Sequence, residues 1–272
     1  MDSQDIKRMA EAIVSSLGLT SSPVGVRLLS ETDATPELAE ELHQHRYCQA
    51  LMKARRGQSV LLDATGISCP AAASAFGFKP LPEQLANGKG LVGFGIVSDE
   101  AVARRMFEGM TRIEPGRVSR LHLFPLEKAE YVPDVVIVEA EVEQLMWIAL
   151  AYLHATGGER VQGSTAVLQA TCVDSTIIPY VEKRLNYGLG CYGCRDATDI
   201  DAAETVLGFP GKALPAIVEH LQYLGAKAIP RSRVKGAYGT LTHATRTDRV
   251  ESDVDCGAPS PAAEVGAHAD EK

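Results

Sequence analysis

The chain has 272 residues, of which 45% are hydrophobic and 23% are charged. This composition and length are those of a folded globular protein with its own core, and they exclude a disordered or fibrous chain. Lys and Arg number 27 against 35 Asp and Glu, a net charge of −8, which argues against a nucleic acid or an anionic membrane surface as the partner.

The sequence shows no pattern of export or membrane insertion. Residues 1–19 contain acidic side chains and lack the long apolar stretch of a signal peptide. The longest apolar run, residues 146–153, is far shorter than the roughly 20 residues that a membrane span needs. Six cysteines are too few for a disulfide framework, so we expect a cytoplasmic protein whose cysteines are free thiols, redox groups or metal ligands.

Helical and strand patterns alternate along the chain. In chain order, the sequence predicts a helix over 5–18, a strand over 23–29, a helix over 46–56, a strand over 59–63, helices over 70–76 and 98–110, strands over 118–123 and 134–139, a helix over 142–154, a strand over 166–171, and helices over 200–207 and 214–224. This alternation predicts an α/β (or α+β) fold, in which one layered domain over residues 1–240 has a mixed sheet flanked by helices.

The apolar periodicity stops near residue 241. Residues 246–272 contain seven acidic and three basic residues among Ala, Gly, Pro and Ser. We therefore expect residues 241–272 to form a disordered acidic tail.

Five cysteines carry the pattern that points most clearly to chemistry: Cys48, Cys69, Cys172, Cys191 and Cys194. Cys69 precedes a proline, and proline favours the first position of a helix. Cys69 is thus expected at an N-cap, where free amides and the helix dipole favour the thiolate. Cys191 and Cys194 lie in a glycine-rich segment, so backbone amides can approach closely and donate hydrogen bonds to sulfur.

Several kinds of site are compatible with these cysteines. An iron–sulfur cluster takes about four thiolates, often from glycine-rich turns. A structural zinc site usually has two local Cys-x-x-Cys pairs, whereas this chain has one, at Cys191 and Cys194. That pair alone is a candidate redox dithiol. The remaining alternative is a set of buried free cysteines, which are common in protein cores.

A glycine-rich segment over residues 88–93 matches the G-x-G-x-x-G pattern of dinucleotide-binding sites. That pattern binds a dinucleotide only where it follows a strand and opens a helix. Here the preceding residues have a helical pattern and the following residues 94–97 an extended one. The sequence therefore favours a glycine-rich turn over a dinucleotide site.

The chain resembles family 169 of the domains of unknown function, which is common in archaea and anaerobic bacteria. The resemblance covers residues 22–224 and rests on these segments: PVGV (23–26), Cys48 followed by ARRG (54–57), Cys69-Pro70 with AFGF (75–78), PLE (125–127), PDVVIV (133–138), QLM (144–146), CVD (172–174) and GCYGCR (190–195). The family pattern has cysteine at the first four of the five positions, and more often serine at that of Cys194. No activity or substrate follows from the resemblance.

Four cysteines of the family pattern are the number that one [4Fe–4S] cluster requires, and the occurrence in anaerobes agrees with such a cluster. We therefore expect an iron–sulfur protein that acts as a redox enzyme or an accessory electron-transfer protein. Its cluster is expected to be bound by Cys48, Cys69, Cys172 and Cys191, and its partner to be a redox protein or a small-molecule substrate.

Further residues beside these cysteines are candidates for supporting roles. Cys194, Arg195 and Asp174 are the candidate catalytic groups, Cys194 as a spare ligand or reactive thiol. Gly188, Gly190 and Gly193 are the candidate cofactor-binding positions. The alternatives are a zinc site, the Cys191–Cys194 dithiol, and a non-enzymatic protein that binds a small ligand or a partner and has structural cysteines.

Overall fold

The computed structural model describes residues 1–233. The tail predicted over residues 241–272 lies outside the described residues. The chain divides into two units, Met1–Lys227 and a second one that begins at Ala228. Every element discussed below belongs to the first unit except α11 (Ala228–Arg233), which is the described part of the second.

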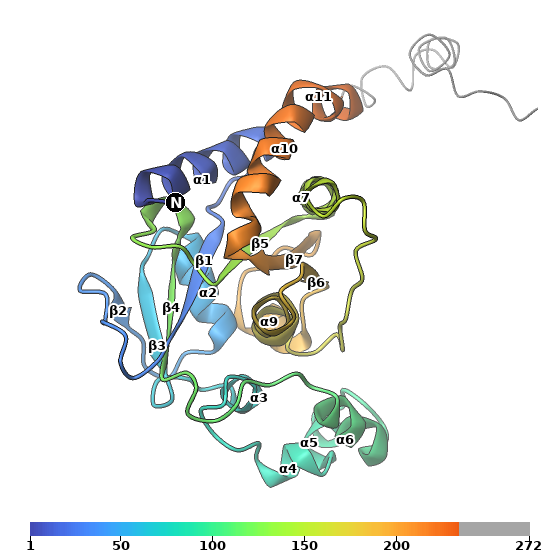
Figure 1. Ribbon diagram of the computed structural model, residues 1–272. Coiled ribbons are helices and arrows are strands. Elements are labelled where there is room, and N and C mark those ends of the chain that lie inside the picture. Colours follow the sequence, from blue (N-terminus) through green and yellow to red (C-terminus); the bar gives the residue numbers. More distant parts are fainter. Residues whose placement is uncertain (234–272) are drawn as a thin grey trace, which may run out of the picture. The chain divides into compact units, whose positions relative to one another are not determined.

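A seven-stranded sheet forms the centre of the first unit (Figure 1), with the strand order β2-β3-β4-β1-β5-β7-β6. The strands are β1 (Val24–Leu29), β2 (Glu40–Glu41), β3 (Val60–Asp63), β4 (Arg120–Pro125), β5 (Val135–Glu141), β6 (Asn186–Gly188) and β7 (Glu204–Pro210). In the described part of the chain, β2 and β3 pair in parallel and the other neighbours pair antiparallel. The sheet is therefore mixed, and the predicted fold class is confirmed.

Helices cover both faces of this sheet. The helices α2 (Tyr47–Arg55) and α3 (Pro70–Ala75) and the π-helix η2 (Ala170–Ile177) share one core with alternate strand residues such as Leu121 and Leu123. The helices α1 (Ser3–Leu17), α7 (Val142–Ala155) and α10 (Leu214–Ala226) pack together and contribute nothing to that core. Because successive strand residues point to opposite faces, this second group covers the other face.

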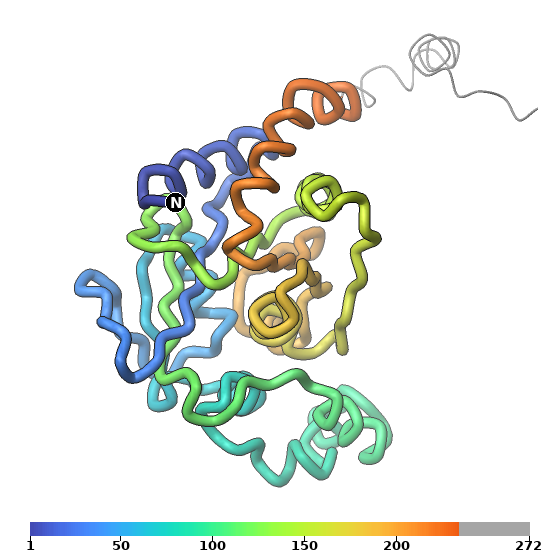
Figure 2. Tube along the Cα trace, in the orientation of Figure 1, coloured from blue at the N-terminus to red at the C-terminus, as the bar shows by residue number. Residues whose placement is uncertain are grey.

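A small group of helices follows α3 and stands apart from the sheet in the trace (Figure 2). It consists of α4 (Glu83–Ala86), α5 (Lys89–Gly93) and α6 (Glu100–Glu108), which contact one another. The remaining short elements are α8 (Ile178–Glu182), α9 (Tyr192–Ala197), η1 (Leu126–Lys128) and η3 (Gly211–Ala213). Among the helices of residues 1–233, none is long and apolar enough to cross a membrane.

Two predicted elements are wrong. Residues 204–207, predicted within a helix over 200–207, belong to β7, which pairs along its whole length with β5. Pairing with a buried central strand overrides local helical spacing, and the β-branched and aromatic residues of β7 suit a strand. The strand predicted over 166–171 is absent from the described structure, and the π-helix η2 begins at Ala170 instead.

The glycine-rich segment over 88–93 is also different from its prediction. It is not a turn but contains the short helix α5, and residues 94–97 are not extended. Gly88 caps this helix with φ +90°, where an added Cβ would overlap the carbonyl of Glu100. In the described structure the element directly before the segment is the helix α4, whereas the dinucleotide-binding pattern requires a strand there.

Candidate functional site

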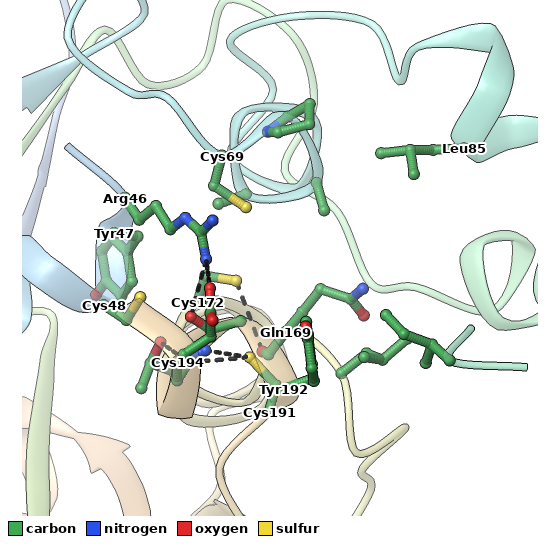
Figure 3. Close-up of a pocket in the computed structure, with 18 of the residues that line it drawn as sticks. Arg46, Tyr47, Cys48, Cys69, Leu85, Gln169, Cys172, Cys191, Tyr192 and Cys194 are labelled. Carbon is green, nitrogen blue, oxygen red and sulfur yellow. Dashed lines mark hydrogen bonds and ion pairs between the residues drawn. The ribbon is translucent and has the colours of Figure 1, made fainter. Parts of the chain in front are cut away.

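A cavity of about 370 Å³ lies beside the sheet-facing helices, and all five of the cysteines singled out in the sequence line it (Figure 3). Cys48 lies in the first turn of α2, and Cys172 lies in the π-helix. Cys69 is the N-cap of α3, as predicted, and Cys191 is the N-cap of α9, three residues before Cys194. The fold thus gathers thiols from four separate segments at one place.

The closest sulfur atoms are those of Cys191 and Cys194, whose Sγ atoms lie 3.0 Å apart. A disulfide bond has a length of about 2.05 Å, so both are free thiols. The Cys194 amide donates a hydrogen bond to Cys191 Sγ at 3.3 Å, because the N-cap side chain receives an amide of the first helical turn. The Cys172 thiol donates to the Gln169 carbonyl oxygen at 3.6 Å.

Burial and mutual proximity keep three of these thiols protonated. Burial raises the pKa of Cys172, and the neighbouring Cys69 raises it further. Hydrogen bonding to Cys194 and burial raise the pKa of Cys191. For Cys194, the bond with Cys191 lowers the pKa, but Cys48 and burial raise it to about 11 overall. These thiols become thiolates at neutral pH only if a cation compensates for their charge.

A buried hydrogen-bond chain fixes the π-helix beside α2. The Tyr47 hydroxyl is 2.8 Å from Thr176 Oγ1, which in turn donates to the Thr171 carbonyl oxygen at 2.6 Å. Thr171 Oγ1 lies 3.4 Å from Cys194 Sγ. These hydrogen bonds therefore link α2, η2 and α9, the three helices that contain Cys48, Cys172 and Cys194. The sequence analysis missed Tyr47 and both threonines, since only the contact between distant segments distinguishes them from other core residues.

Two of the residues predicted to support the site do not line the cavity. The Arg195 guanidinium donates hydrogen bonds to the backbone carbonyls of Leu189, Asp201 and Glu204, and so holds its own loop together. Asp174 belongs to the π-helix, is buried, and accepts a hydrogen bond from Thr165 Oγ1 at 2.6 Å. Burial raises the pKa of Asp174 to about 7 in spite of this bond.

The three candidate glycines have different roles. Gly193 lines the cavity, and its carbonyl accepts a hydrogen bond from Arg46 Nη1 at 3.0 Å. Gly188 packs against the π-helix, and Gly190 has φ +81° and lies against the Arg195 side chain. Among the described residues, the backbone amide that donates a hydrogen bond to a cysteine sulfur is that of Cys194, which bonds to Cys191 Sγ, and not that of a candidate glycine.

A wall of the cavity that the sequence analysis missed is apolar. Its side chains come largely from α4, α5, α6 and the segment between them: Leu85, Leu91, Phe94, Ile96 and Phe107. These positions have ordinary core spacing in the sequence, so nothing distinguishes them as cavity residues. Arg46 and Asp196 are the charged residues among the described residues of the lining, and they lie 3.6 Å apart.

The described residues 1–233 contain no group of three or more His, Cys, Asp or Glu side chains arranged to hold one metal ion. The cysteines at the cavity are therefore arranged as free thiols.

Comparison with known proteins places most of the chain in one family. A family model described as "Uncharacterised ArCR" matches residues 12–220, a range that contains all five cysteines of the cavity. A protein of Methanocaldococcus jannaschii, itself described as uncharacterised, is 29% identical over 226 residues, which cover 82% of this chain and 96% of the relative. No solved structure matches the chain.

Proposed function

The chain belongs to the family DUF169, and from the cysteines at its cavity we propose that it is a cytoplasmic iron–sulfur protein that transfers electrons. It acts either as a redox enzyme or as an accessory to one. The observation that carries the proposal is the convergence of five thiols from four segments at one cavity. In this proposal Cys48, Cys69, Cys172 and Cys191 bind one [4Fe–4S] cluster, which takes four thiolates.

The chemistry of the donors fits a cluster better than it fits a single ion. Around one zinc ion, four ligands must meet at a single point about 2.3 Å from each sulfur. In a four-iron cluster each thiolate binds a different iron, so the ligands lie farther apart. The absence of a one-ion ligand set among the described residues therefore weighs more against zinc than against a cluster. Cys48, Cys69, Cys172 and Cys191 would hold such a cluster as thiolates, so its binding would release their protons.

The surrounding residues suit a buried redox group. The Cys194 amide donates to Cys191 Sγ, and such a hydrogen bond stabilises negative charge on sulfur and raises a reduction potential. Tyr47 packs against Phe76 with ring centroids 4.9 Å apart and keeps water from one side of the cysteines. A bound cluster supplies one-electron transfer. If Cys194 is the spare thiol, all four irons have a protein ligand and electron transfer is favoured over substrate binding at iron.

The test is a series of single Cys→Ser variants, reconstituted anaerobically with ferrous iron and sulfide. We expect C48S, C69S, C172S and C191S each to lose at least about half of the bound iron and the absorption near 400 nm. C194S is the matched control, because it removes a neighbouring thiol of similar burial and is expected to keep both. Circular dichroism of the metal-free variants verifies that they fold. Equal iron content in all five variants contradicts the proposal, and so does the absence of iron from the wild type.

A second candidate is supported by one distance, the 3.0 Å between the sulfur atoms of Cys191 and Cys194. Two thiols this close can exchange with the disulfide of another molecule, which is reduced to two thiols while they form one disulfide. Titration with oxidised glutathione and intact mass measurement detect the loss of two hydrogens. C194S abolishes this exchange but leaves cluster binding, so the same variant separates the two candidates.

A further inference from the structure

The cavity extends beyond the cysteines, and its other part has no role in holding a cluster. We propose that this apolar part binds a small, uncharged, largely apolar molecule through one hydrogen-bonding group that meets the side-chain amide of Gln169. That the bound molecule is a substrate rests on the proposed function. That the apolar part binds such a molecule does not, and binding is also tested on the chain without a cluster.

The apolar wall has the character of a ligand site. Leu85, Leu91 and Phe107 are buried in the core cluster and face the cavity from the helices α4, α5 and α6. The whole cavity, its cysteine part included, measures about 370 Å³, which is near the lower end of the roughly 300–1,000 Å³ in which proteins bind small molecules, usually between apolar walls with a few polar groups. Its apolar part therefore has room only for a small ligand. A small aromatic or aliphatic molecule fits such a site.

The charges at the cavity favour an uncharged ligand. Arg46 Nη1 donates to the Gly193 carbonyl and lies 3.6 Å from the Asp196 carboxylate, so the two charges of the described lining compensate each other. A charged ligand would lose its hydration on entering this apolar space without gaining an unpaired opposite charge. The cavity is therefore expected to bind neutral molecules more tightly than carboxylates or amines.

Gln169 supplies the polar group. Its side chain lines the cavity, and in the described part of the chain its amide makes no hydrogen bond. Figure 3 shows this side chain extending from the cysteines towards the side on which Leu85 lies. The backbone at Gln169 has φ +58°, a left-handed conformation that non-glycine residues seldom adopt and that is often kept at ligand sites. A carbonyl or amide of the ligand can bond to this side chain at the border between thiols and apolar wall.

Two aromatic residues mark where the cavity meets solvent. Phe94 and Tyr192 line the cavity although they are 71% and 60% exposed. A residue can combine these properties only at an opening, so a small molecule can enter without unfolding of the core. The ligand then reaches the apolar wall beside the thiols.

The test compares three probes of similar size: benzamide, benzoate and toluene. Their dissociation constants are measured by ligand-detected NMR on the metal-free chain and on the iron-reconstituted chain. We expect benzamide to bind about tenfold more tightly than toluene or benzoate, which corresponds to one net hydrogen bond or one uncompensated charge. Q169L is expected to remove the preference for benzamide over toluene and to leave toluene binding unchanged. Q162L, which alters an exposed glutamine on the same segment, is the matched control and keeps the preference.

If Q169L does not fold, Q169N takes its place, because asparagine tolerates the left-handed conformation and shortens the amide by one methylene. It is expected to weaken benzamide binding several-fold. Benzoate binding as tight as that of benzamide overturns the inference. So does a preference for benzamide that persists after Gln169 is substituted. Iron is measured on the same samples. A colourless chain that binds benzamide refutes the cluster alone, and a cluster-bearing chain that binds no probe refutes this inference alone.

Discussion

The buried carboxyl of Glu139 makes the stability of the chain depend on pH, and substitution E139Q isolates its contribution. Glu139 lies on β5 with 3% of its side chain exposed, and its Oε2 atom has no hydrogen-bond partner among the described residues. The nearest cation, Arg55 Nη1, is 3.6 Å from that atom and also bonds to Glu204. Burial raises the pKa of Glu139 from 4.5 to about 7, in spite of the opposing effect of Arg55.

The sign and size of the effect follow from these two pKa values. Below pH 4.5 the group is protonated in both the folded and the unfolded chain, so the folded chain holds no buried charge here. Between pH 4.5 and 7 the unfolded chain ionises first, so the free energy of unfolding falls as pH rises. The full loss is about 3 kcal/mol, reached above pH 7, since one pKa unit corresponds to about 1.4 kcal/mol. Glutamine has the same shape and does not titrate.

Denaturant unfolding of the metal-free wild type and E139Q at pH 5 and pH 8 measures this effect. The difference between the two proteins is used because other groups also titrate in this range, among them His122, whose pKa burial lowers to about 4. We expect E139Q to gain about 2.5 kcal/mol relative to the wild type between the two pH values, because the unfolded chain has already begun to ionise at pH 5. E37Q, at an exposed glutamate, is the control and shows no such gain. A difference that stays constant within about 0.5 kcal/mol would refute the burial argument.

Further predictions concern packing and thiol reactivity. G208A is expected to destabilise the chain by about 3 kcal/mol, because an added Cβ would overlap the Ser175 carbonyl behind β7, and chemical denaturation measures the loss. Gly225 lies within α10, and a Cβ added there would be at an ordinary 3.5 Å from Ser16 Oγ. G225A is therefore expected to stabilise the chain by about 0.5 kcal/mol in the same assay. Equal effects of G208A and G225A on the free energy of unfolding would contradict the packing described for Gly208. In the metal-free chain at pH 8, Cys194 is expected to react with iodoacetamide at least about tenfold more slowly than free cysteine, because its raised pKa leaves little thiolate. Mass spectrometry follows the reaction. Reaction at the rate of free cysteine would contradict the raised pKa.

Elements whose structure depends on neighbouring residues in the sequence could be predicted from the sequence. The N-cap role of Cys69 follows from the proline after it, and the β-branched run of β5 predicts a strand covered on both faces. The strand β7 could not be predicted in this way, because residues 204–207 fit helical spacing and become a strand through pairing with β5. The π-helix lacks a sequence signal altogether, since its wide turn is stabilised by contacts such as that between Tyr47 and Thr176.

The candidate site was predictable in its chemistry and not in its shape. Residue type alone marks the five cysteines as candidate site residues. Cys69 and Cys172, however, are separated by 103 positions, and they line one cavity only because the sheet places α3 beside the π-helix. The apolar wall from Leu85 and Phe107 has no signature in the sequence for the same reason. For Arg195 the sequence suggested a role that the structure does not support. Arg195 follows Cys194 directly in the sequence, but its guanidinium bonds to backbone carbonyls and does not line the cavity.

The most direct measurement for the central claim is an absorption spectrum with iron, zinc and acid-labile sulfide analysis on one sample of the anaerobically purified wild-type chain. A bound [4Fe–4S] cluster predicts a brown protein with a broad band near 400 nm and about four irons and four sulfides per chain. A colourless, folded protein that lacks iron and sulfide and does not take them up on reconstitution would contradict the claim.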